Sequence, residues 1–516
     1  MSGPFSERSS GVLLHLTSLP GPHGGGDLGP AAHQFAEFLA RAGQRHWQML
    51  PVVPPGGGNS PYDSPSAFAG SPWLISLESL ARHGLLDPAD LVAPERLRRA
   101  PHTLYAGARR FRERRLKQAF ARFQARPSAR HELAQTLEAN RAWLADHALF
   151  CALKRAQGGR PWTAWPGELA RREPHALDHA RRELAADIDY EVFVQGEFAR
   201  QWAALRSRCN ELGLKLLGDV PMFVAHDAAD VWANQSLFQL HPDGQKRVVA
   251  GVPPDYFSAD GQLWGNPVYD WQRLRETGYA WWVARLRATL ERFDAVRLDH
   301  FIGFHRYWEV PAHATSAKDG HFVEAPGHEL MERLRRELGH LPFVAEDLGV
   351  MTEGVVRLRD DFELPGMRVL LFAFGSDWRE YQPHRYPRRV VAYTGTHDND
   401  TLCGWLSSFD REHDLGRKAD LLAERARALA YANSDAKEAH WDLVRTVLAS
   451  VADTAIFPIQ DLLGLGTEAR MNVPGVAHGN WSFRVRADAL TPALAERLAS
   501  LSDTYERIPE SLRRNP

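Results

Sequence analysis

Hydrophobic residues gather along the chain in eight short, nearly unbroken runs instead of alternating with polar residues. Unbroken apolar runs of this length are typical of parallel strands that are covered on both faces. The runs are Val12–Leu16, Trp47–Leu50, Leu214–Val220, Ala295–Asp299, Phe343–Glu346, Arg368–Phe374, Val390–Thr394 and Thr454–Pro458.

Most of the intervals between these runs carry apolar residues at helical spacing. Phe198, Trp202, Leu205 and Cys209 fall on one helical face just before one run, and a similar pattern precedes Phe343. Strands that alternate with helices in this way predict an α/β fold, a (β/α)8 or TIM barrel. In that fold the chemistry takes place at the carboxyl ends of the strands.

Two intervals are too long for simple crossovers. Residues 77–189 are rich in Arg, Leu and Ala at helical spacing and predict a helical insertion subdomain, in which we interpret Arg109–Arg115 as a solvated helix face. Residues 221–279 are rich in Pro, Gly and aromatic residues and predict a loop subdomain at the C-terminal face of the barrel. The first barrel units are then expected in residues 1–76 and the remaining ones in 190–516.

Charge and cysteine content narrow the class of protein. Lys and Arg number 62 and Asp and Glu 64, so the chain lacks the basic excess typical of partners of nucleic acid or anionic membranes, and we expect neither partner. No apolar run is long enough to span a membrane. Cys151, Cys209 and Cys403 are widely spaced and odd in number, which indicates reduced thiols and a cytoplasmic protein.

Three of the predicted strand ends are acidic. Asp299 and Glu346 close two runs, and Asp398 follows a third. Because side chains alternate along a strand, Arg297 faces the same way as Asp299 and should hold it ionised. Glu346 closes an apolar strand, where burial should raise the pKa of its carboxyl and keep it protonated. Retaining glycosidases use one ionised and one protonated carboxyl group in this way.

The sequence resembles, nearly end to end, the amylomaltases of the α-amylase-like superfamily, also called 4-α-glucanotransferases or disproportionating enzymes. The motifs that carry the resemblance are Ser18–Pro20, Ser60–Ser66, Gly218–Pro221, Gly251–Asp255, Leu263–Pro267, Arg297–Phe301, Ala345–Gly349, Gly395–Asn399 and Arg470–Gly475.

The resemblance implies a role for each of the three carboxylates. Asp299 would be the nucleophile, Glu346 the general acid and base, and Asp398 a third carboxylate that binds hydroxyl groups of the distorted sugar. The enzyme would move segments of maltodextrin- or amylose-type α-1,4-glucan from a donor to an acceptor, without cofactor or metal.

The same resemblance implies the residues that bind substrate. Tyr62 would be a stacking platform, and Trp264 part of a loop that reaches over the substrate. The implied substrate-binding residues are Tyr62, Asp219, Trp264, Asn266, Arg297 and His397.

Other functions are weaker interpretations of the same residues. The pattern Gly24-x-Gly26-x-x-Gly29 matches a dinucleotide fingerprint, but the strand before it ends too early for the tight turn that a dinucleotide requires. His175 and His179 lie one helical turn apart without the Glu of a zinc-protease motif, and we interpret them as a solvated face. A non-catalytic glucan-binding protein would not need three carboxylates at strand ends.

A hydrolase is the closest alternative, because it differs only in whether water or a sugar accepts the glycosyl group. Tyr256, Phe257 and Trp264 lie in the Pro/Gly-rich segment, and we expect them to hold an acceptor sugar and exclude water. The sequence therefore favours a transferase and leaves the hydrolase open.

Overall fold

A barrel of eight parallel strands forms the centre of the molecule. The structure is a computed structural model, and it describes residue 5 and residues 7–254, 260–375 and 379–513. The strands lie side by side in the order β10-β11-β12-β1-β2-β3-β6-β9. The barrel closes where the Ala345 N–H donates to the Pro365 carbonyl, 2.9 Å away, directly before β10. The predicted TIM barrel is confirmed.

All eight predicted strands are present, with two notable differences in their bounds. In place of the run Val12–Leu16, strand β1 spans Ser9–Leu13. The run Arg368–Phe374 is a strand only as far as Val369, because the apolar residues Leu370–Phe372 form a 3-10 turn that begins at the buried Leu370. The barrel strands are β1 (Ser9–Leu13), β2 (His46–Gln48), β3 (Lys215–Val220), β6 (Ala295–Leu298), β9 (Phe343–Ala345), β10 (Gly366–Val369), β11 (Val390–Tyr393) and β12 (Thr454–Pro458).

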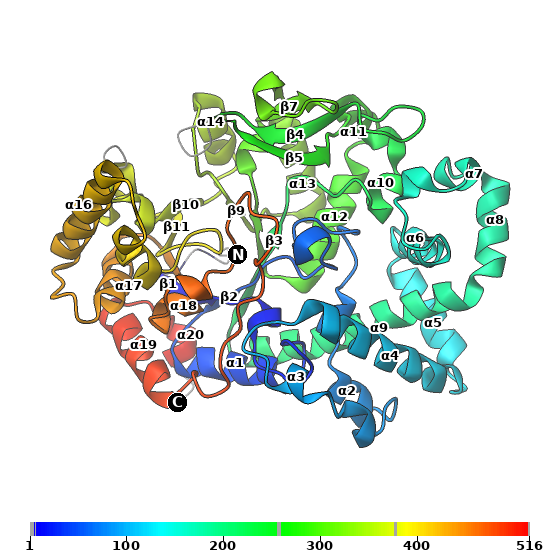
Figure 1. Cartoon of the computed structure of the whole chain (residues 1–516), viewed down its shortest axis with the longest axis horizontal. Coiled ribbons are helices and arrows are strands. Elements are labelled where there is room, and N and C mark those ends of the chain that lie inside the picture. The colour runs from blue at the N-terminus through cyan, green and yellow to red at the C-terminus, as the bar shows by residue number, and fades with distance from the viewer. Residues whose placement is uncertain (1–4, 6, 255–259, 376–378, 514–516) are drawn as a thin grey trace.

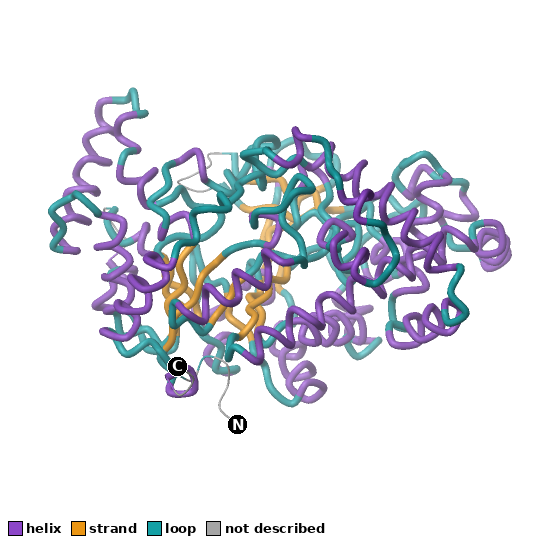
Figure 2. The backbone as a smooth tube through the Cα atoms, turned by 90° about the horizontal axis from the view of Figure 1, so that it is seen from below, coloured by secondary structure: helices purple, strands orange, loops and turns teal. Residues whose placement is uncertain are grey.

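Helices surround the strands, which gather in the middle of the molecule (Figures 1 and 2). None of the helices in the described part of the chain is long and apolar enough to cross a membrane. The α-helices are α1 (Pro30–Arg41), α2 (Leu77–Arg82), α3 (Glu95–Arg98), α4 (Tyr105–Gln124), α5 (Ala129–Ala139), α6 (Leu144–Ala156), α7 (Gly167–Ala170), α8 (Pro174–Glu183), α9 (Ala185–Glu211), α10 (Ala229–Ala233), α11 (Trp271–Glu276), α12 (Ala280–Arg292), α13 (Gly327–Leu338), α14 (Glu353–Asp361), α15 (Leu402–Leu406), α16 (Leu415–Ala432), α17 (Ala439–Ala449), α18 (Ile459–Leu462), α19 (Pro492–Thr504) and α20 (Glu510–Arg513).

Helices α2 to α9 lie between β2 and β3, and α4 to α8 extend to the right of the barrel in Figure 1. The interpretation of Arg109–Arg115 as a solvated face is wrong for Arg112, which is buried and donates from Nη2 to Asp27 Oδ2 at 2.8 Å. Helical spacing explains this, because Arg112 shares a face of α4 with the buried Ala108 and Leu116. His175 and His179 are exposed on α8, as predicted.

A second, antiparallel sheet has the strand order β5-β4-β7-β8. Its strands β4 (Val248–Val252), β5 (Gln262–Pro267), β7 (Arg306–Pro311) and β8 (His321–Glu324) were not among the predicted runs. Strand β4 pairs with both β5 and β7, so this sheet joins the segment after β3 to the segment after β6. It lies above the barrel in Figure 1.

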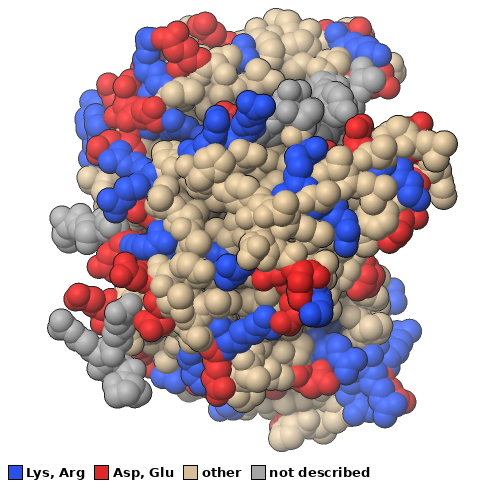
Figure 3. All heavy atoms as spheres, turned by 90° about the vertical axis from the view of Figure 1, so that its left-hand side faces the viewer, with Lys and Arg blue, Asp and Glu red and all other residues tan. Residues whose placement is uncertain are grey.

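Basic and acidic side chains are interspersed on the face shown in Figure 3, which is the left-hand side of Figure 1. Both signs of charge occur over most of this face, and Lys and Arg gather at its lower right in the figure. This agrees with the near-equal totals of 62 Lys and Arg and 64 Asp and Glu.

Candidate active site

A charge network connects the carboxyl ends of β3 and β6. Asp219 and Arg297 are register partners on these neighbouring strands, and both are buried. Arg297 Nη2 donates to Asp219 Oδ2 at 2.7 Å and to Asp299 Oδ1 at 2.8 Å. One guanidinium therefore bridges two carboxylates, and its rigid donors fix where Asp299 points.

Tyr62 completes this network from the loop after β2. Its hydroxyl donates to Asp219 Oδ2 at 2.7 Å and accepts from Arg297 Nη2 at 3.2 Å. Its ring stacks on His397, with 5.2 Å between centroids and 13° between planes. Burial, together with the charge of Asp219, raises the pKa of Tyr62 well above its ordinary value, so the hydroxyl stays protonated and able to donate.

Glu346 lies beside Asp299 because of strand register. Leu298 on β6 pairs with Ala345 on β9, and the residues that follow them are Asp299 and Glu346, respectively. The backbone N–H of His300 donates to Glu346 Oε2 at 2.8 Å, from a left-handed conformation with φ of 50°. Burial raises the pKa of Glu346 well above its ordinary range, and the charge of Asp299 raises it further, whereas Arg297 opposes both. The predicted direction of the Glu346 pKa is confirmed.

Asp398 follows β11 and is held by residues from the segment after β12. Asn472 Nδ2 donates to Asp398 Oδ1 at 2.6 Å, and the Asn472 N–H donates to the His397 carbonyl at 3.0 Å. Arg470 Nη2 donates to the Asp398 carbonyl at 2.5 Å. His397 Nε2 lies 3.3 Å from Asp398 Oδ1. The turn 397–398 is thus fixed on both its backbone and its side chains.

No role for Arg470 or Asn472 was predicted from the sequence. The motif Arg470–Gly475 contributed only to the resemblance, and it lies beyond a helix and a 3-10 turn that follow the strand Thr454–Pro458. Its partner Asp398 is 74 positions away in the chain, so no local pattern connects the two residues.

The predicted substrate-binding residues Trp264 and Asn266 lie on β5. The Trp264 side chain is 38% exposed, and its ring centroid lies 4.8 Å from that of His300, at 80° between planes. The Asn266 amide donates to the Val224 carbonyl at 2.9 Å, so it holds the loop after β3. Tyr256 and Phe257 lie outside the described residues.

Two more side chains donate to the same loop after β3. Arg285 Nη2 donates to the Pro221 carbonyl at 2.8 Å, and the Tyr269 hydroxyl donates to the Met222 carbonyl at 2.9 Å. With Asn266, three donors fix the backbone directly after Asp219. The β5 strand, which carries Trp264, is thereby tied to the charge network.

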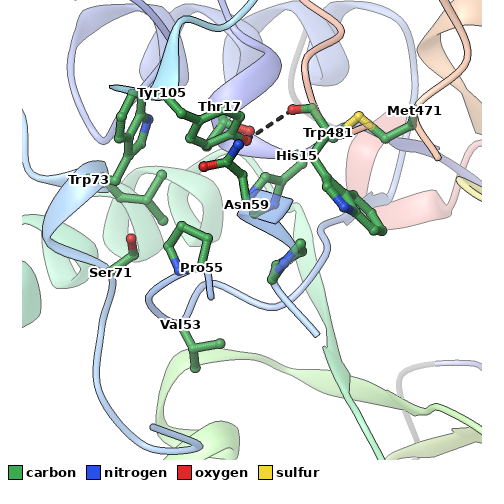
Figure 4. Close-up of a pocket in the computed structure, with 12 residues that line it drawn as sticks. His15, Thr17, Val53, Pro55, Asn59, Ser71, Trp73, Tyr105, Met471 and Trp481 are labelled. Atoms are coloured by element: carbon green, nitrogen blue, oxygen red, sulfur yellow. Dashed lines mark hydrogen bonds between the residues drawn. The ribbon is translucent and has the colours of Figure 1, made fainter. Parts of the chain in front are cut away.

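A pocket adjoins the charge network on the side of the loops after β1 and β2 (Figure 4). The Tyr105 hydroxyl donates to the Trp481 carbonyl across it at 2.9 Å. Trp481 also contacts the rings of Tyr62 and His397, with centroids 5.7 and 5.9 Å away. The pocket lining is His15, Thr17, Val53, Pro55, Asn59, Pro61, Ser71, Trp73, Leu74, Tyr105, Met471 and Trp481.

Three groups of His, Cys, Asp and Glu in the described part of the chain have ligand atoms close enough together to hold a metal ion. None of them includes Asp299, Glu346 or Asp398. These three carboxyl groups instead accept hydrogen bonds from Arg297, the His300 backbone and Asn472.

Comparison with known proteins identifies the family. Residues 14–491 match the 4-alpha-glucanotransferase family. The 4-alpha-glucanotransferase of Synechocystis sp. is 46% identical over 511 residues, which cover 98% of this chain and 99% of that protein. The 4-alpha-glucanotransferase of Thermus thermophilus is 46% identical over 506 residues, which cover 97% and 99%.

Solved structures agree with the sequence relatives. The amylomaltase from Streptococcus agalactiae in complex with acarbose superimposes with a TM-score of 0.92 at 35% identity, over 97% of this chain and 100% of that one. The amylomaltase from Corynebacterium glutamicum, at 20% identity and a TM-score of 0.72, shares the fold. The chain belongs to the 4-alpha-glucanotransferase family, the amylomaltases.

Proposed function

We propose that this protein transfers a segment of an α-1,4-glucan to the 4-hydroxyl group of an acceptor glucan or glucose, by a retaining double displacement through a glycosyl–Asp299 intermediate. The observation that carries the proposal is the pairing of two carboxyl groups in different surroundings. Asp299 accepts a hydrogen bond from Arg297 at 2.8 Å, whereas burial raises the pKa of the neighbouring Glu346.

In the first step, the Asp299 carboxylate attacks the anomeric carbon of the donor. The bond from that carbon to the glycosidic oxygen breaks, and Glu346 gives its proton to the departing oxygen. The product is a glycosyl ester of Asp299 and a shortened glucan with a free hydroxyl group. Glu346 is left ionised beside an ester that no longer carries the Asp299 charge.

In the second step, Glu346 takes the proton from the 4-hydroxyl group of the acceptor. The acceptor oxygen attacks the anomeric carbon, and the ester bond to Asp299 breaks. Two inversions restore the original configuration. Both carboxyl groups return to their starting states, because Glu346 takes one proton from the acceptor in place of the one that it gave to the leaving group.

The remaining predicted residues would bind the sugar at the site of cleavage. Asp398, held by Asn472, offers acceptor oxygens to sugar hydroxyl groups, and the side chain of Asp398 is 44% exposed. Tyr62 and Trp264 offer flat rings for the apolar faces of the sugars. The similarity to an amylomaltase solved with acarbose supports binding of the same class of ligand here.

Transfer requires an acceptor sugar to compete with water at about 55 M, and orientation by a binding site can contribute effective molarities of ~10⁵ M or more. Trp264 is partly exposed on β5 beside His300, and we expect it to help orient an acceptor and exclude water. This favours transfer over hydrolysis.

Incubation with pure maltotriose tests the proposal. We expect glucose together with a ladder of maltodextrins longer and shorter than maltotriose, while the total of reducing ends stays nearly constant. Reducing ends that rise in step with maltotriose consumption, without any longer product, would make the protein a hydrolase. Asp299→Asn protein purified in the same way is the control for contaminating amylase.

A further inference from the structure

Three side chains that accept hydrogen bonds or coordinate metals converge behind the loop after β1. They are His23 and Asp27 from that loop and Glu78 from α2, and their ligand atoms all lie within 4.8 Å of one another. His23 Nδ1 lies 3.6 Å from Glu78 Oε1. None of the three belongs to the charge network of the active site.

The tautomer of His23 is determined by its other ring nitrogen. His23 Nε2 lies 3.0 Å from the Leu91 carbonyl, which can only accept, so Nε2 carries the hydrogen and Nδ1 presents a lone pair. Nδ1 has no hydrogen-bond partner, and the side chain is fully buried.

The lone pair of His23 Nδ1 and the Glu78 carboxylate repel each other in a buried place unless a positive group lies between them. The separation of 3.6 Å between His23 Nδ1 and Glu78 Oε1 is too long for a hydrogen bond. Two ligands of a tetrahedral zinc ion, each about 2.0–2.1 Å from the metal, lie about 3.4 Å apart. The observed spacing therefore matches a pair of metal ligands.

We propose that His23 Nδ1, Glu78 Oε1 and the Asp27 carboxylate bind one divalent ion of the zinc class, with water as the fourth ligand. An imidazole nitrogen together with carboxylate oxygens suits zinc and disfavours calcium or magnesium, which take oxygen ligands. Arg112 pairs with Asp27 at 2.8 Å and offsets its charge, so His23 and Glu78 are the principal ligands. The Glu78 side chain is 25% exposed and gives the ion a route from solvent.

The ion would fix the loop after β1 to α2. Arg112, which pairs with Asp27, also lies over the Trp73 ring, 5.4 Å from its centroid, and Trp73 lines the pocket in Figure 4. Because the ligands come together only in the folded chain, binding should stabilise the fold.

Metal titration of the full-length protein tests the site. After chelator treatment and dialysis, calorimetry with Zn²⁺ should show one equivalent bound, and Co²⁺ should give the visible absorption of a tetrahedral site. The thermal unfolding midpoint should rise with Zn²⁺. His23→Phe keeps a ring to stack on Phe111, whose centroid is 5.6 Å away, but lacks the nitrogen. Glu78→Gln keeps the shape and lacks the charge.

Both variants should bind at least about tenfold more weakly, a loss of about 1.4 kcal/mol. The matched control is His175→Ala, which removes the histidine from a separate exposed group made of Glu168, Glu173 and His175. This control should bind the metal as tightly as wild type does. Wild-type protein without a tetrahedral Co²⁺ spectrum, or unchanged affinity in Glu78→Gln, overturns the proposal. Should His23→Phe fail to fold, the partly exposed Glu78→Gln still decides.

Discussion

Two buried arginines at opposite ends of the barrel serve different purposes. At the carboxyl ends of the strands, Arg297 contacts the carboxylates Asp219 and Asp299. At the amino ends, Arg507 is fully buried and donates to backbone carbonyls: Leu448 at 2.7 Å, Ser9 at 3.0 Å and Ser450 at 3.1 Å. One arginine donates to carboxylates, and the other donates to backbone carbonyl oxygens.

The two environments have opposite effects on the guanidinium. Burial lowers the pKa of Arg297, but the charges of Asp219 and Asp299 outweigh it and raise that pKa well above its ordinary value. Burial lowers the pKa of Arg507 to about 9. Arg507 satisfies carbonyls at the end of α17, which no helical N–H can reach. Arg297 thus bridges two carboxylates at one end of the barrel, and Arg507 connects chain segments at the other.

The largest expected effect comes from the catalytic end. Asp299→Asn should lower kcat by about 10⁴-fold or more, because the covalent route is lost, while thermal unfolding stays close to wild type. Initial rates on maltotriose and a thermal melt check both parts. Activity within about tenfold of wild type, or ~1.4 kcal/mol of barrier, would falsify the nucleophile assignment.

Glu346→Gln should slow cleavage of natural glucans by about 10²- to 10⁴-fold, because the leaving oxygen receives no proton. A glycosyl fluoride needs no proton for the first step and should be partly spared. In the wild type, kcat should fall as pH rises through the raised pKa of Glu346, since the proton donor is then lost. Equal losses on both donors, or an unchanged basic limb in the variant, would contradict the acid role.

Arg507→Met tests the other end of the barrel. The substitution removes the Arg507 hydrogen bonds to the Ser9 and Ser450 carbonyls, whereas the Leu448 carbonyl keeps Arg8 as a donor. It also removes a buried charge, so we expect a loss of about 2–4 kcal/mol in the free energy of unfolding. The kcat of folded protein should remain within about twofold. Denaturant titration measures the free energy of unfolding, and initial rates divided by the concentration of folded protein give kcat. The same substitution at the exposed Arg486, Arg486→Met, is the control. Equal stability of the two variants would contradict a structural role for Arg507.

Asn472→Ala tests whether Asp398 needs the hydrogen bond that it accepts from Asn472. Loss of the 2.6 Å hydrogen bond to Asp398 should lower kcat/KM by about tenfold, with little change in stability. Asn472→Asp has the same shape but places a like charge against Asp398, so its loss should be larger. Wild-type kcat/KM in both variants would show that Asp398 does not need this partner.

The barrel was predictable because each strand carries its own local pattern. The run Thr454–Pro458 coincides with β12, and Phe198, Trp202 and Leu205 are all buried on α9, as their spacing predicted. An apolar run does not, however, distinguish a strand from a buried turn. The residues after Val369 therefore belong to a 3-10 turn instead of the predicted strand.

The features that sequence analysis missed depend on contacts between distant segments. Strands β4 and β7 pair across more than fifty residues, and β7, with the sequence Arg-Tyr-Trp-Glu-Val-Pro, shows neither an unbroken apolar run nor a regular alternation of apolar and polar residues. The partners Asn472 and Asp398, and the burial of Arg112 against Asp27, likewise arise from tertiary packing. The helical spacing of Arg112 can indicate that it is buried, but no local pattern shows that its partner is Asp27 or that Asn472 binds Asp398.

If Asp299 and Glu346 act as proposed, the register between β6 and β9 makes turnover a measure of correct folding. Leu298 opposite Ala345 is the alignment that sets Asp299 beside Glu346. Since side chains alternate along a strand, a slip of one position would turn one of these carboxyl groups to the other face of the sheet. Such a misfolded barrel would keep nearly the same helix and strand content, so circular dichroism would not distinguish it. Turnover of maltotriose in a refolded sample would therefore count the correctly aligned molecules alone.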